Sequence, residues 1–445
     1  MVRTKADNTN THQTVFIVSM GCSKNLVDSE VLMRRLEKTG CRVMFDGEIP
    51  RNAIVVVNTC GFIGDAKEES VNEILRLGQL REQGHISELI VMGCLSERYR
   101  KELPNQIPEV DKWYGKTDWN AIVEHLSTTS ANVKPYDRVL TTPSHYAYLK
   151  IAEGCNRFCG FCAIPIITGR YKSRMPDEIV AEARMLASRG VTELNVIAQD
   201  LSAYGTDLEG GSSRLAALID ALADVEGIRR IRLHYAYPKD FPLDVLDVMA
   251  RRHNVCKYLD IALQHSDDKV LSAMRRHITG RETVELLNEI RKRVPGIHIR
   301  TTLMTGYPGE GDAEFESLMQ FARTQRFERM GAFAYCEEED TYAARNLKDA
   351  IPEHVKQQRL ERLMALQEEI SDEIQQQKIG KTFEVVIDRE ETQNWVGRTE
   401  FDSPEVDPEV LIEKTAGMSL KPGDYVDVEI TEAWPFELKG RVVTR

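Results

Sequence analysis

Three cysteines stand close together in the middle of the chain with the spacing CxxxCxxC: Cys155, Cys159 and Cys162. They follow a strand-like stretch that runs from Tyr146 to Ala152. Three thiolates on one short loop can hold three irons of a cubic iron–sulfur cluster and leave the fourth iron without a protein ligand. Clusters that only transfer electrons usually have four cysteine ligands. The missing ligand therefore predicts that a substrate or cofactor binds iron directly.

A zinc site or a disulfide framework could also use such a triplet. Structural zinc takes four N or S ligands, usually from paired CxxC units, and no second pair or suitably spaced His lies nearby. Disulfide frameworks suit small secreted chains. This chain has 445 residues, nine cysteines, no apolar signal segment after Met1 and no run long enough to span a bilayer. These features favour an iron–sulfur cluster in a protein of the reducing cytoplasm.

A second set of cysteines is spread over the first hundred residues. Cys22, Cys60 and Cys94 each follow a predicted strand directly. In an open α/β sheet the loops after parallel strands share one edge, so these three side chains would converge. Taken singly, each is better explained as a small buried apolar side chain. Three at equivalent strand ends, each beside a glycine that permits a tight turn, predict a second three-cysteine cluster; the glycines are Gly21, Gly61 and Gly93.

The remaining three cysteines lack this placement. Cys41 and Cys256 are interpreted as packing residues, and Cys336 stays ambiguous. The composition, with 42% hydrophobic and 7% aromatic residues, is that of an ordinary globular protein, and the length suggests two to four domains.

An N-terminal domain over residues 14–130 is expected to position the second set. Short apolar runs alternate there with amphipathic stretches, which is typical of a doubly wound α/β sheet. The expected strands are 14–20, 53–58, 88–92 and a fourth beginning at 113–115, and the expected helices begin at Val27, Asp65, Ser96 and Asp118.

Residues 141–378 repeat a strand-then-helix unit six times, which predicts a partial (β/α)6 barrel resembling a TIM barrel. Functional side chains gather at the carboxyl ends of such strands. The expected strands are 147–152, 194–198, 230–235, 258–263, 298–303 and 331–335, with helices beginning near Pro176, Ser213, Pro242, Asp267, Arg281 and Asp312.

Polar residues end the predicted barrel strands, among them Glu153, Gln199 and Gln264. Phe161 lies between two cysteines of the triplet and could cover a cofactor there, although plain hydrophobic packing accounts for it equally well. Gly306 opens a Gly-Tyr-Pro-Gly turn that would let a nucleotide-sized ligand approach the backbone, but such turns are common. These residues form the expected cofactor surroundings.

The C-terminal part begins with a long charged helix over 353–377, for which Gly380 is the expected stop. From Lys381 the hydrophobic period changes toward two, with Gly, Pro and Asp between the apolar runs. This pattern predicts a small antiparallel β-barrel of OB-like size over 380–445.

The charge of this barrel bears on its partner. Residues 381–445 carry 15 Asp or Glu and 8 Lys or Arg, so they contribute −7 of the chain's net −12. A domain that grips a polyanion should be basic, because phosphate neutralisation dominates nucleic-acid affinity. An acidic face would instead attract a basic protein, unless it serves only solubility.

The CxxxCxxC loop after the first strand of a partial barrel resembles the radical S-adenosylmethionine (SAM) superfamily. The upstream trio Cys22, Cys60 and Cys94 and the C-terminal barrel, which resembles a TRAM domain, further resemble the methylthiotransferases. Three runs are similar to the branch that modifies ribosomal protein S-twelve of the small subunit: Gly21-Cys-Ser-Lys-Asn-Leu-Val-Asp-Ser-Glu30, Asn58-Thr-Cys-Gly-Phe-Ile63 and Ser403-Pro-Glu-Val-Asp407.

The resemblance implies two 4Fe–4S clusters and SAM as both radical source and methyl donor. Cys155, Cys159 and Cys162 would hold the radical-generating cluster, and Cys22, Cys60 and Cys94 the auxiliary cluster that carries the sulfur. The cofactor contacts would include Phe161, Glu153, Gln199, Gln264 and Gly306, and no catalytic side chain is expected beyond the cluster ligands. The product would be a methylthio group on the β-carbon of an aspartate.

Two other functions stay open. One is the same chemistry on a modified adenosine of transfer RNA, and the other is a non-catalytic iron–sulfur scaffold. The sequence favours the ribosomal protein as partner, no membrane association and nucleic acid only as a secondary possibility, whereas the sulfur donor and the electron donor are not indicated.

Overall fold

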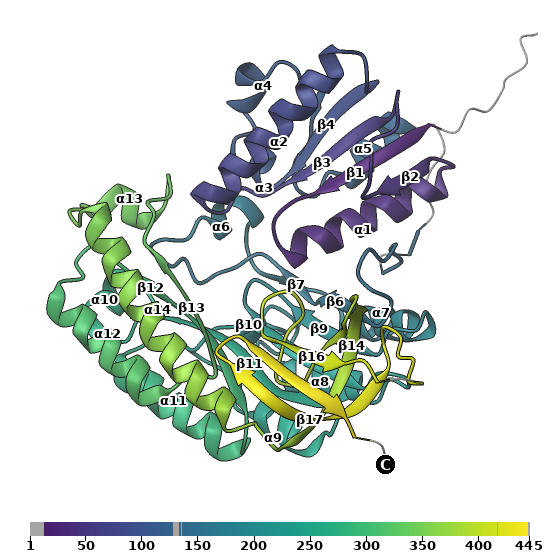
Figure 1. The fold of residues 1–445 in the computed structure, drawn as a ribbon. Coiled ribbons are helices and arrows are strands. Elements are labelled where there is room, and N and C mark those ends of the chain that lie inside the picture. Colours follow the sequence, from purple (N-terminus) through teal and green to yellow (C-terminus); the bar gives the residue numbers. More distant parts are fainter. Residues whose placement is uncertain (1–12, 128–132, 135, 416, 444–445) are drawn as a thin grey trace, which may run out of the picture. The chain divides into compact units, whose positions relative to one another are not determined.

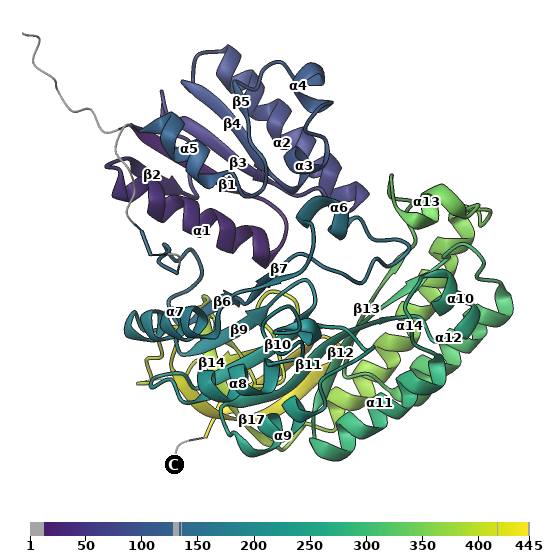
Figure 2. The same cartoon turned by 180° about the vertical axis from the view of Figure 1, so that it is seen from behind.

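The computed structural model describes residues 13–127, 133–134, 136–415 and 417–443. The expected domain ends at residues 130 and 445 lie outside these ranges. The chain divides into two compact units, one up to Thr141 and the other from Thr142 onward. Figures 1 and 2 show the elements of each unit from two sides.

The first unit is built on a parallel sheet with the order β2-β1-β3-β4-β5. Its strands alternate their buried side chains between two apolar clusters, one on each face. Leu32 of α1 and Ile122 of α5 lie in one cluster, and Ile74 of α2 and Leu103 of α4 lie in the other. The predicted doubly wound α/β fold is therefore confirmed. The elements are β1 (Thr14–Ser19), α1 (Ser23–Lys38), β2 (Arg42–Phe45), β3 (Ile54–Thr59), α2 (Gly64–Glu82), β4 (Glu88–Gly93), α3 (Cys94–Arg98), α4 (Leu103–Gln106), β5 (Lys112–Trp113) and α5 (Trp119–Leu126).

Three details of this unit differ from the expectation. The helix expected from Val27 begins four residues earlier, at Ser23, so that Cys22 becomes its N-cap residue. The helix expected from Ser96 is two short helices, because a turn interrupts it and Pro104 starts a new helical segment. The edge strand β2 was not expected, since its half-exposed residues give no clear period of two.

The second unit contains a parallel sheet of six strands in the order β13-β12-β11-β10-β9-β6, which confirms the partial barrel. Helices cover one face of this sheet (Figure 1). The expected first strand over 147–152 is divided, because β6 ends at Lys150 and β7 pairs in antiparallel fashion with β8. The strands are β6 (Tyr146–Lys150), β7 (Ala152–Glu153), β8 (Lys172–Ser173), β9 (Glu193–Ile197), β10 (Arg230–Ala236), β11 (Val255–Gln264), β12 (His298–Thr305) and β13 (Arg329–Ala334).

The helices of this unit begin within a few residues of the expected positions. Asp267 caps α10, since its side chain accepts the backbone N–H groups of Lys269 and Val270. Thr279 and Glu282 form a capping box at α11. The helices are α6 (Ile164–Thr168), α7 (Pro176–Ser188), the 3-10 turn η1 (Leu201–Ala203), α8 (Leu215–Ala223), α9 (Asp244–Arg251), α10 (Asp268–Ala273), α11 (Gly280–Arg293), α12 (Asp312–Gln325), α13 (Tyr342–Asn346) and α14 (Glu353–Gln376).

A closed five-stranded barrel in the order β14-β15-β16-β18-β17 ends the chain and confirms the small barrel. It is not wholly antiparallel, because β16 and β18 pair in parallel. Gly380 does not cap α14, whose C-cap is Gln377; instead its N–H donates to the carbonyl of Ile430 in β17. The strands are β14 (Thr382–Glu390), β15 (Asn394–Arg398), which the sequence did not indicate, β16 (Glu409–Glu413), β17 (Tyr425–Trp434) and β18 (Glu437–Val442).

None of the helices over the described ranges combines the length and apolar character that crossing a bilayer would need.

Candidate metal centres

Cys22, Cys60 and Cys94 lie at the carboxyl edge of the first sheet. Cys22 follows β1 as the N-cap residue of α1, Cys60 follows β3 directly, and Cys94 is the first residue of α3 after β4. Cys60 and Cys94 are buried, whereas Cys22 is exposed. Since β1 and β3 are neighbours at which the strand order reverses, this edge is the position where open α/β sheets bind ligands.

A buried asparagine, Asn25, ties the three strand ends together. Its Nδ2 donates to the carbonyls of Met20 and Thr59 at 3.1 and 2.8 Å, and its Oδ1 accepts from Cys94 Sγ at 3.4 Å. The Asn25 carbonyl in turn accepts from Asn58 at 2.8 Å. Sequence reasoning missed Asn25; the available signal was a polar residue three positions after Cys22, on the first turn of a helix. It positions the loops that carry all three cysteines.

Glycines hold these turns close to one another. Gly21 has φ +84°, and a Cβ added there would lie 2.7 Å from Cys60 Cβ and 2.9 Å from its Sγ. At Gly61 an added Cβ would lie 2.6 Å from the backbone of Leu95, next to Cys94. The glycines therefore let the cysteine-bearing turns pack against one another.

Burial disfavours the thiolate form of the two buried cysteines, Cys60 and Cys94. Burial raises the pKa of Cys60, and burial raises that of Cys94 to about 12, with the neighbouring Cys22 and Cys60 adding to the rise. Metal binding would displace their protons, and a set of soft thiolates suits an iron–sulfur cluster.

Cys155, Cys159 and Cys162 lie on the loop between β7 and α6, near the carboxyl end of β6. Backbone hydrogen bonds fix this loop at both ends: Cys155 N–H donates to Gly169 O at 3.2 Å, and Gly160 N–H donates to Met274 O at 2.8 Å. A Cβ at Gly154, where φ is +79°, would clash with the carbonyl of Arg170. The triplet therefore sits on a constrained loop.

Burial also disfavours the thiolate form of Cys155 and Cys162 on this loop. Burial raises the pKa of Cys155 to about 11 and that of Cys162 further, and Cys159 contributes to both shifts. Over the described ranges, no three His, Cys, Asp or Glu side chains are arranged around a single metal ion. The cysteines of a cubic cluster each bind a different iron, so the two arrangements differ.

Two arginines and a tyrosine contact the cysteines of this loop, and one of them, Arg157, lies on the loop itself. The guanidinium groups of Arg157 and Arg276 both lie over the Tyr237 ring, with their central carbons 4.2 and 4.0 Å from the ring centre. Arg157 is paired with Asp200 at 2.6 Å, and its backbone N–H donates to Cys155 Sγ at 3.5 Å. Arg276 Nη1 donates to Cys159 Sγ at 3.2 Å. Hydrogen bonds to the ligand sulfurs are one means by which proteins set the reduction potential of an iron–sulfur cluster.

The residues expected around the cofactor are distributed along the carboxyl edge of the second sheet. Gln199 donates to Glu153, which also accepts from Lys150 at 2.9 Å. Gln264 ends β11 with φ +71°, and its Oε1 has no hydrogen-bond partner among the described residues. The Oε1 of Gln199 likewise has none within those ranges. These orphan acceptors are compatible with a ligand that donates hydrogen bonds.

Phe161 and Gly306 have structural roles of their own. The Phe161 ring packs edge-on against Tyr307 at a centroid distance of 6.3 Å, within a small apolar cluster. The space beside the Gly306 Cα is filled by Lys356 of α14, with Lys356 Cβ 2.8 Å from where a glycine Cβ would be. Packing alone therefore accounts for both residues.

The other cysteines show no common placement. Cys41 packs against the α1 side of the first sheet, Cys256 is buried on β11, and Cys336 is exposed.

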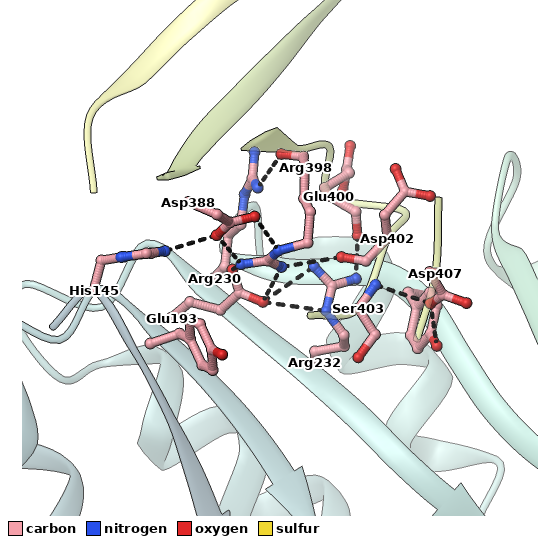
Figure 3. Close-up of polar contacts among 12 residues, drawn as sticks. His145, Glu193, Arg230, Arg232, Asp388, Arg398, Glu400, Asp402, Ser403 and Asp407 are labelled. Carbon is pink, nitrogen blue, oxygen red and sulfur yellow. Dashed lines mark hydrogen bonds and ion pairs between the residues drawn. The ribbon is translucent and has the colours of Figure 1, made fainter. Parts of the chain in front are cut away.

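The C-terminal barrel is joined to the helix-free face of the second sheet by a buried ionic network (Figure 3). Glu193, fully buried at the start of β9, accepts from Arg398 at 3.0 Å and from Arg232 at 3.3 Å. Arg398 also pairs with Asp388 at 2.7 Å, and Asp388 contacts His145 at 2.7 Å. Burial by itself would raise the pKa of Glu193, but the arginines, Arg398 first, lower it to about 2.

The loop between β15 and β16, residues 399–408, enters the same network; we call it the anchor loop. Asp402 pairs with Arg329 at 2.5 Å, and Asp407 accepts from Tyr258 at 2.8 Å. Ser403 Oγ lies 3.3 Å from His234 Nε2. Within the described residues, the Ser403-Pro-Glu-Val-Asp407 run is therefore engaged inside this unit.

Three protein families match successive parts of this chain. Residues 14–115 match the uncharacterized protein family UPF0004, residues 149–322 the radical SAM superfamily, and residues 379–443 the TRAM domain. A ribosomal protein uS12 methylthiotransferase, RimO, of Phocaeicola vulgatus is 55% identical over 97% of this chain and 99% of its own length. The chain belongs to this methylthiotransferase family. Membership of the radical SAM superfamily implies a 4Fe–4S cluster and SAM.

Further relatives of the same family agree. The uS12 methylthiotransferase of Porphyromonas gingivalis is 56% identical, over 96% of this chain and 99% of that protein. The one from Christiangramia forsetii is 50% identical, over 95% and 93%. Among solved structures, the radical SAM methyltransferase TsrM from Kitasatospora setae matches with a TM-score of 0.53 at 16% identity, covering 72% of each chain. That likeness concerns the fold alone.

Proposed function

We propose that this chain transfers a methylthio group to the β-carbon of an aspartate in ribosomal protein uS12, the small-subunit protein S-twelve. The observation that carries the proposal is the sequence identity to uS12 methylthiotransferases. More than half of the aligned residues are identical, and the alignments span all three matched regions. The cysteine sets at two sheet edges provide the chemistry that such a transfer needs.

We assign the radical-generating 4Fe–4S cluster to Cys155, Cys159 and Cys162, and the auxiliary cluster to Cys22, Cys60 and Cys94. When bound, the first cluster supplies one electron for cleavage of SAM, and the second offers an iron for the sulfur to be transferred. The protein's own contribution is positioning. Asn25 and Gly21 hold the auxiliary cysteines together, and the bond between Gly160 and Met274 fixes the other loop.

For SAM we propose contacts at the carboxyl edge of the second sheet. Glu153 and Gln199 form a hydrogen-bonded pair there, and the orphan Oε1 atoms of Gln199 and Gln264 are available acceptors. Phe161 and Gly306 remain candidates from the sequence, although their packing against Tyr307 and Lys356 accounts for them without a cofactor. We also propose three domains, 14–130, 141–378 and 380–445.

The net negative charge of the C-terminal barrel is weaker evidence for a basic protein substrate than the count of acidic residues suggests. Four of its carboxylates already have partners on or beside the second sheet. These pairs are Asp388 with His145, Asp402 with Arg329, Glu405 with Tyr146 and Asp407 with Tyr258. These carboxylates stabilise the unit and are not free to attract a basic partner. The choice of uS12 over transfer RNA therefore rests on the relatives.

Mass spectrometry of two substrates tests the choice. Ribosomal protein uS12 and digested transfer RNA are compared from cells with and without this chain. We expect a methylthio mass increment on an aspartate of uS12 that disappears when the chain is deleted. A chain-dependent increment on transfer RNA, with uS12 unchanged, would contradict the proposal.

Single cysteine substitutions separate the two cluster assignments. Cys60→Ala should abolish sulfur insertion and leave reductive cleavage of SAM largely intact, because the radical cluster keeps its ligands. Cys159→Ala should abolish both reactions. Both are measured by following 5′-deoxyadenosine and methylthiolated peptide in anaerobic assays. Cleavage that persists in Cys159→Ala would overturn the ligand assignment.

A further inference from the structure

Arg276 is a buried cation that has no carboxylate partner among the described residues. Its side chain is only 2% exposed, and it follows α10 in a turn beneath the cysteine loop. Nη1 donates to Cys159 Sγ at 3.2 Å, Nη2 donates to the carbonyl of Ala262, and Nε has no partner within the same described ranges. The Cys159 thiol, which becomes an anion when it binds a metal, is thus a direct hydrogen-bond partner of this cation.

The other deeply buried arginines of the described chain are all compensated. Each pairs with an Asp or Glu within 4 Å; they are Arg138, Arg230, Arg232, Arg329, Arg359 and Arg398. Arg157, whose guanidinium also lies over the Tyr237 ring, pairs with Asp200 and Asp240. Within the part of the chain that the structure describes, Arg276 departs from this pattern.

An uncompensated buried charge is strongly unfavourable, so proteins retain one where a counter-charge binds. A cluster held by three thiolates is an anion, and the electron it accepts makes it more negative. A guanidinium in hydrogen-bond contact with one of those sulfurs compensates that charge. Tyr237 holds Arg276 in place, because its ring stacks on the guanidinium at 4.0 Å and its hydroxyl donates to the Arg276 carbonyl at 2.9 Å.

We propose that Arg276 is the built-in counter-charge of the cluster on Cys155, Cys159 and Cys162, and that it raises the reduction potential of that cluster. The inference rests on the proposed assignment of Cys159 as a ligand. Arg276 acts through the cluster's ligand sulfur, so it is a tuning and positioning residue. It favours uptake of one electron from an external one-electron reductant, because a nearby positive charge stabilises the more negative reduced state.

The test is a redox titration of the full-length chain, with Cys22, Cys60 and Cys94 replaced by Ala so that one cluster titrates. The ratio of reduced to oxidised cluster is read by electron paramagnetic resonance at fixed potentials. Arg276→Gln removes the charge and should lower this ratio about tenfold, equivalent to about 59 mV for a one-electron couple. Arg276→Lys keeps the charge and should stay within about threefold of the parent.

Arg275→Gln is the matched control. Arg275 is the preceding residue, is exposed, and stacks on Tyr342 at 4.8 Å, so solvent screens its charge. Arg275→Gln removes one positive charge from the same turn and should leave the ratio of reduced to oxidised cluster within about threefold of the parent. A cluster lost in Arg276→Gln but retained in Arg276→Lys would also support a counter-charge role.

Three results would overturn the inference. They are an unchanged potential in Arg276→Gln, equal shifts in the Gln and Lys variants, and cluster loss in both variants while circular dichroism shows an intact fold. A parent protein that binds no iron at the triplet would instead refute the proposed function itself, so the two failures are distinguishable.

Discussion

At the scale of single residues, this protein places charges in its interior and compensates them. The set of Glu193, Arg232 and Arg398 is at most 1% exposed, yet each ion has an opposite partner. Removing one member of such a set costs far more than the pair contributes, because the remaining charges stay buried. The network therefore acts as a lock on the barrel's position against the second sheet.

Glu193→Gln should lower the free energy of unfolding of the second unit by about 3–5 kcal/mol at neutral pH, because it leaves buried arginines without their carboxylate. Urea unfolding of the metal-free chain, followed by circular dichroism, measures the change. Glu373→Gln is the control, since Glu373 of α14 pairs with Arg326 at 2.6 Å and both side chains are more than 40% exposed. It should cost about 1 kcal/mol or less. Equal effects of the two substitutions would argue against the lock.

The same carboxylate gives a pH dependence. The pKa of Glu193 is about 2 in the folded chain and about 4.5 ordinarily, so the unfolded chain binds its proton first. Its stabilising contribution is therefore present above about pH 4.5 and is lost as the pH falls toward about 2. The unfolding free energy of the parent should decline more steeply than that of Glu193→Gln in this window. Parallel slopes in urea titrations would contradict the lowered pKa.

Residue positions were predictable from the sequence where strand order decides them. Cys22, Cys60 and Cys94 could be placed at one edge because each follows a buried apolar strand. Asn25 and Arg276 could not, because their partners lie on other elements: Thr59 is 34 residues from Asn25, and Cys159 is 117 from Arg276. Contacts of that sequence separation leave no local pattern.

At the scale of elements, the tight turns after the strands decide how near the cysteines come. β1 and β3 are neighbours in the sheet, and the turns that follow them meet at Gly21 and Cys60. Elements with a clear hydrophobic periodicity were predicted from the sequence, whereas α6, β2 and β15 were not. They are short, and β15 contains a glycine, so their tertiary pairing outweighs their local preference.

Gly21→Ala should reduce iron binding at Cys22, Cys60 and Cys94, because the added methyl group would meet the Cys60 side chain and strain a backbone at φ +84°. Iron per chain is measured in a background that lacks Cys155, Cys159 and Cys162. Gly47→Ala is the control: Gly47 has φ +91°, but no described atom lies within 4 Å of an added Cβ. Gly47→Ala should keep its iron, and equal losses would show that backbone strain alone is responsible.

At the scale of the whole molecule, the two compact units differ in how they are closed. The first unit has its own apolar core on both faces of its sheet. The second sheet has helices on one face only, and its polar face is completed by the C-terminal barrel (Figures 1 and 3). The division into two sheets and a barrel was predictable from the hydrophobic periodicity. The charged face of the second sheet was not, because arginines and glutamates within a strand normally indicate solvent-exposed positions.

A chain ending at Gly380 should lose cooperative unfolding of the second unit. Truncation removes Arg398 and Asp402, so Glu193 keeps only one of its two arginines, Arg232, and Arg329 loses its carboxylate partner. A fragment of residues 13–141 should still melt cooperatively, because both faces of its sheet are covered within it. Thermal melts followed by circular dichroism compare the two. A truncated chain that melts like the parent would show that the barrel is dispensable to the fold.

The anchor loop has a consequence for inheritance. Tyr258, Arg329 and His234 on the second sheet contact Asp407, Asp402 and Ser403 of the barrel, respectively. Recombination that exchanged only the C-terminal barrel with that of a distant homologue would separate these matched sets and produce a poorly folded chimera. The barrel and the sheet should therefore descend as one block, and grafting a new barrel in the laboratory would require transplanting the strand residues that face it.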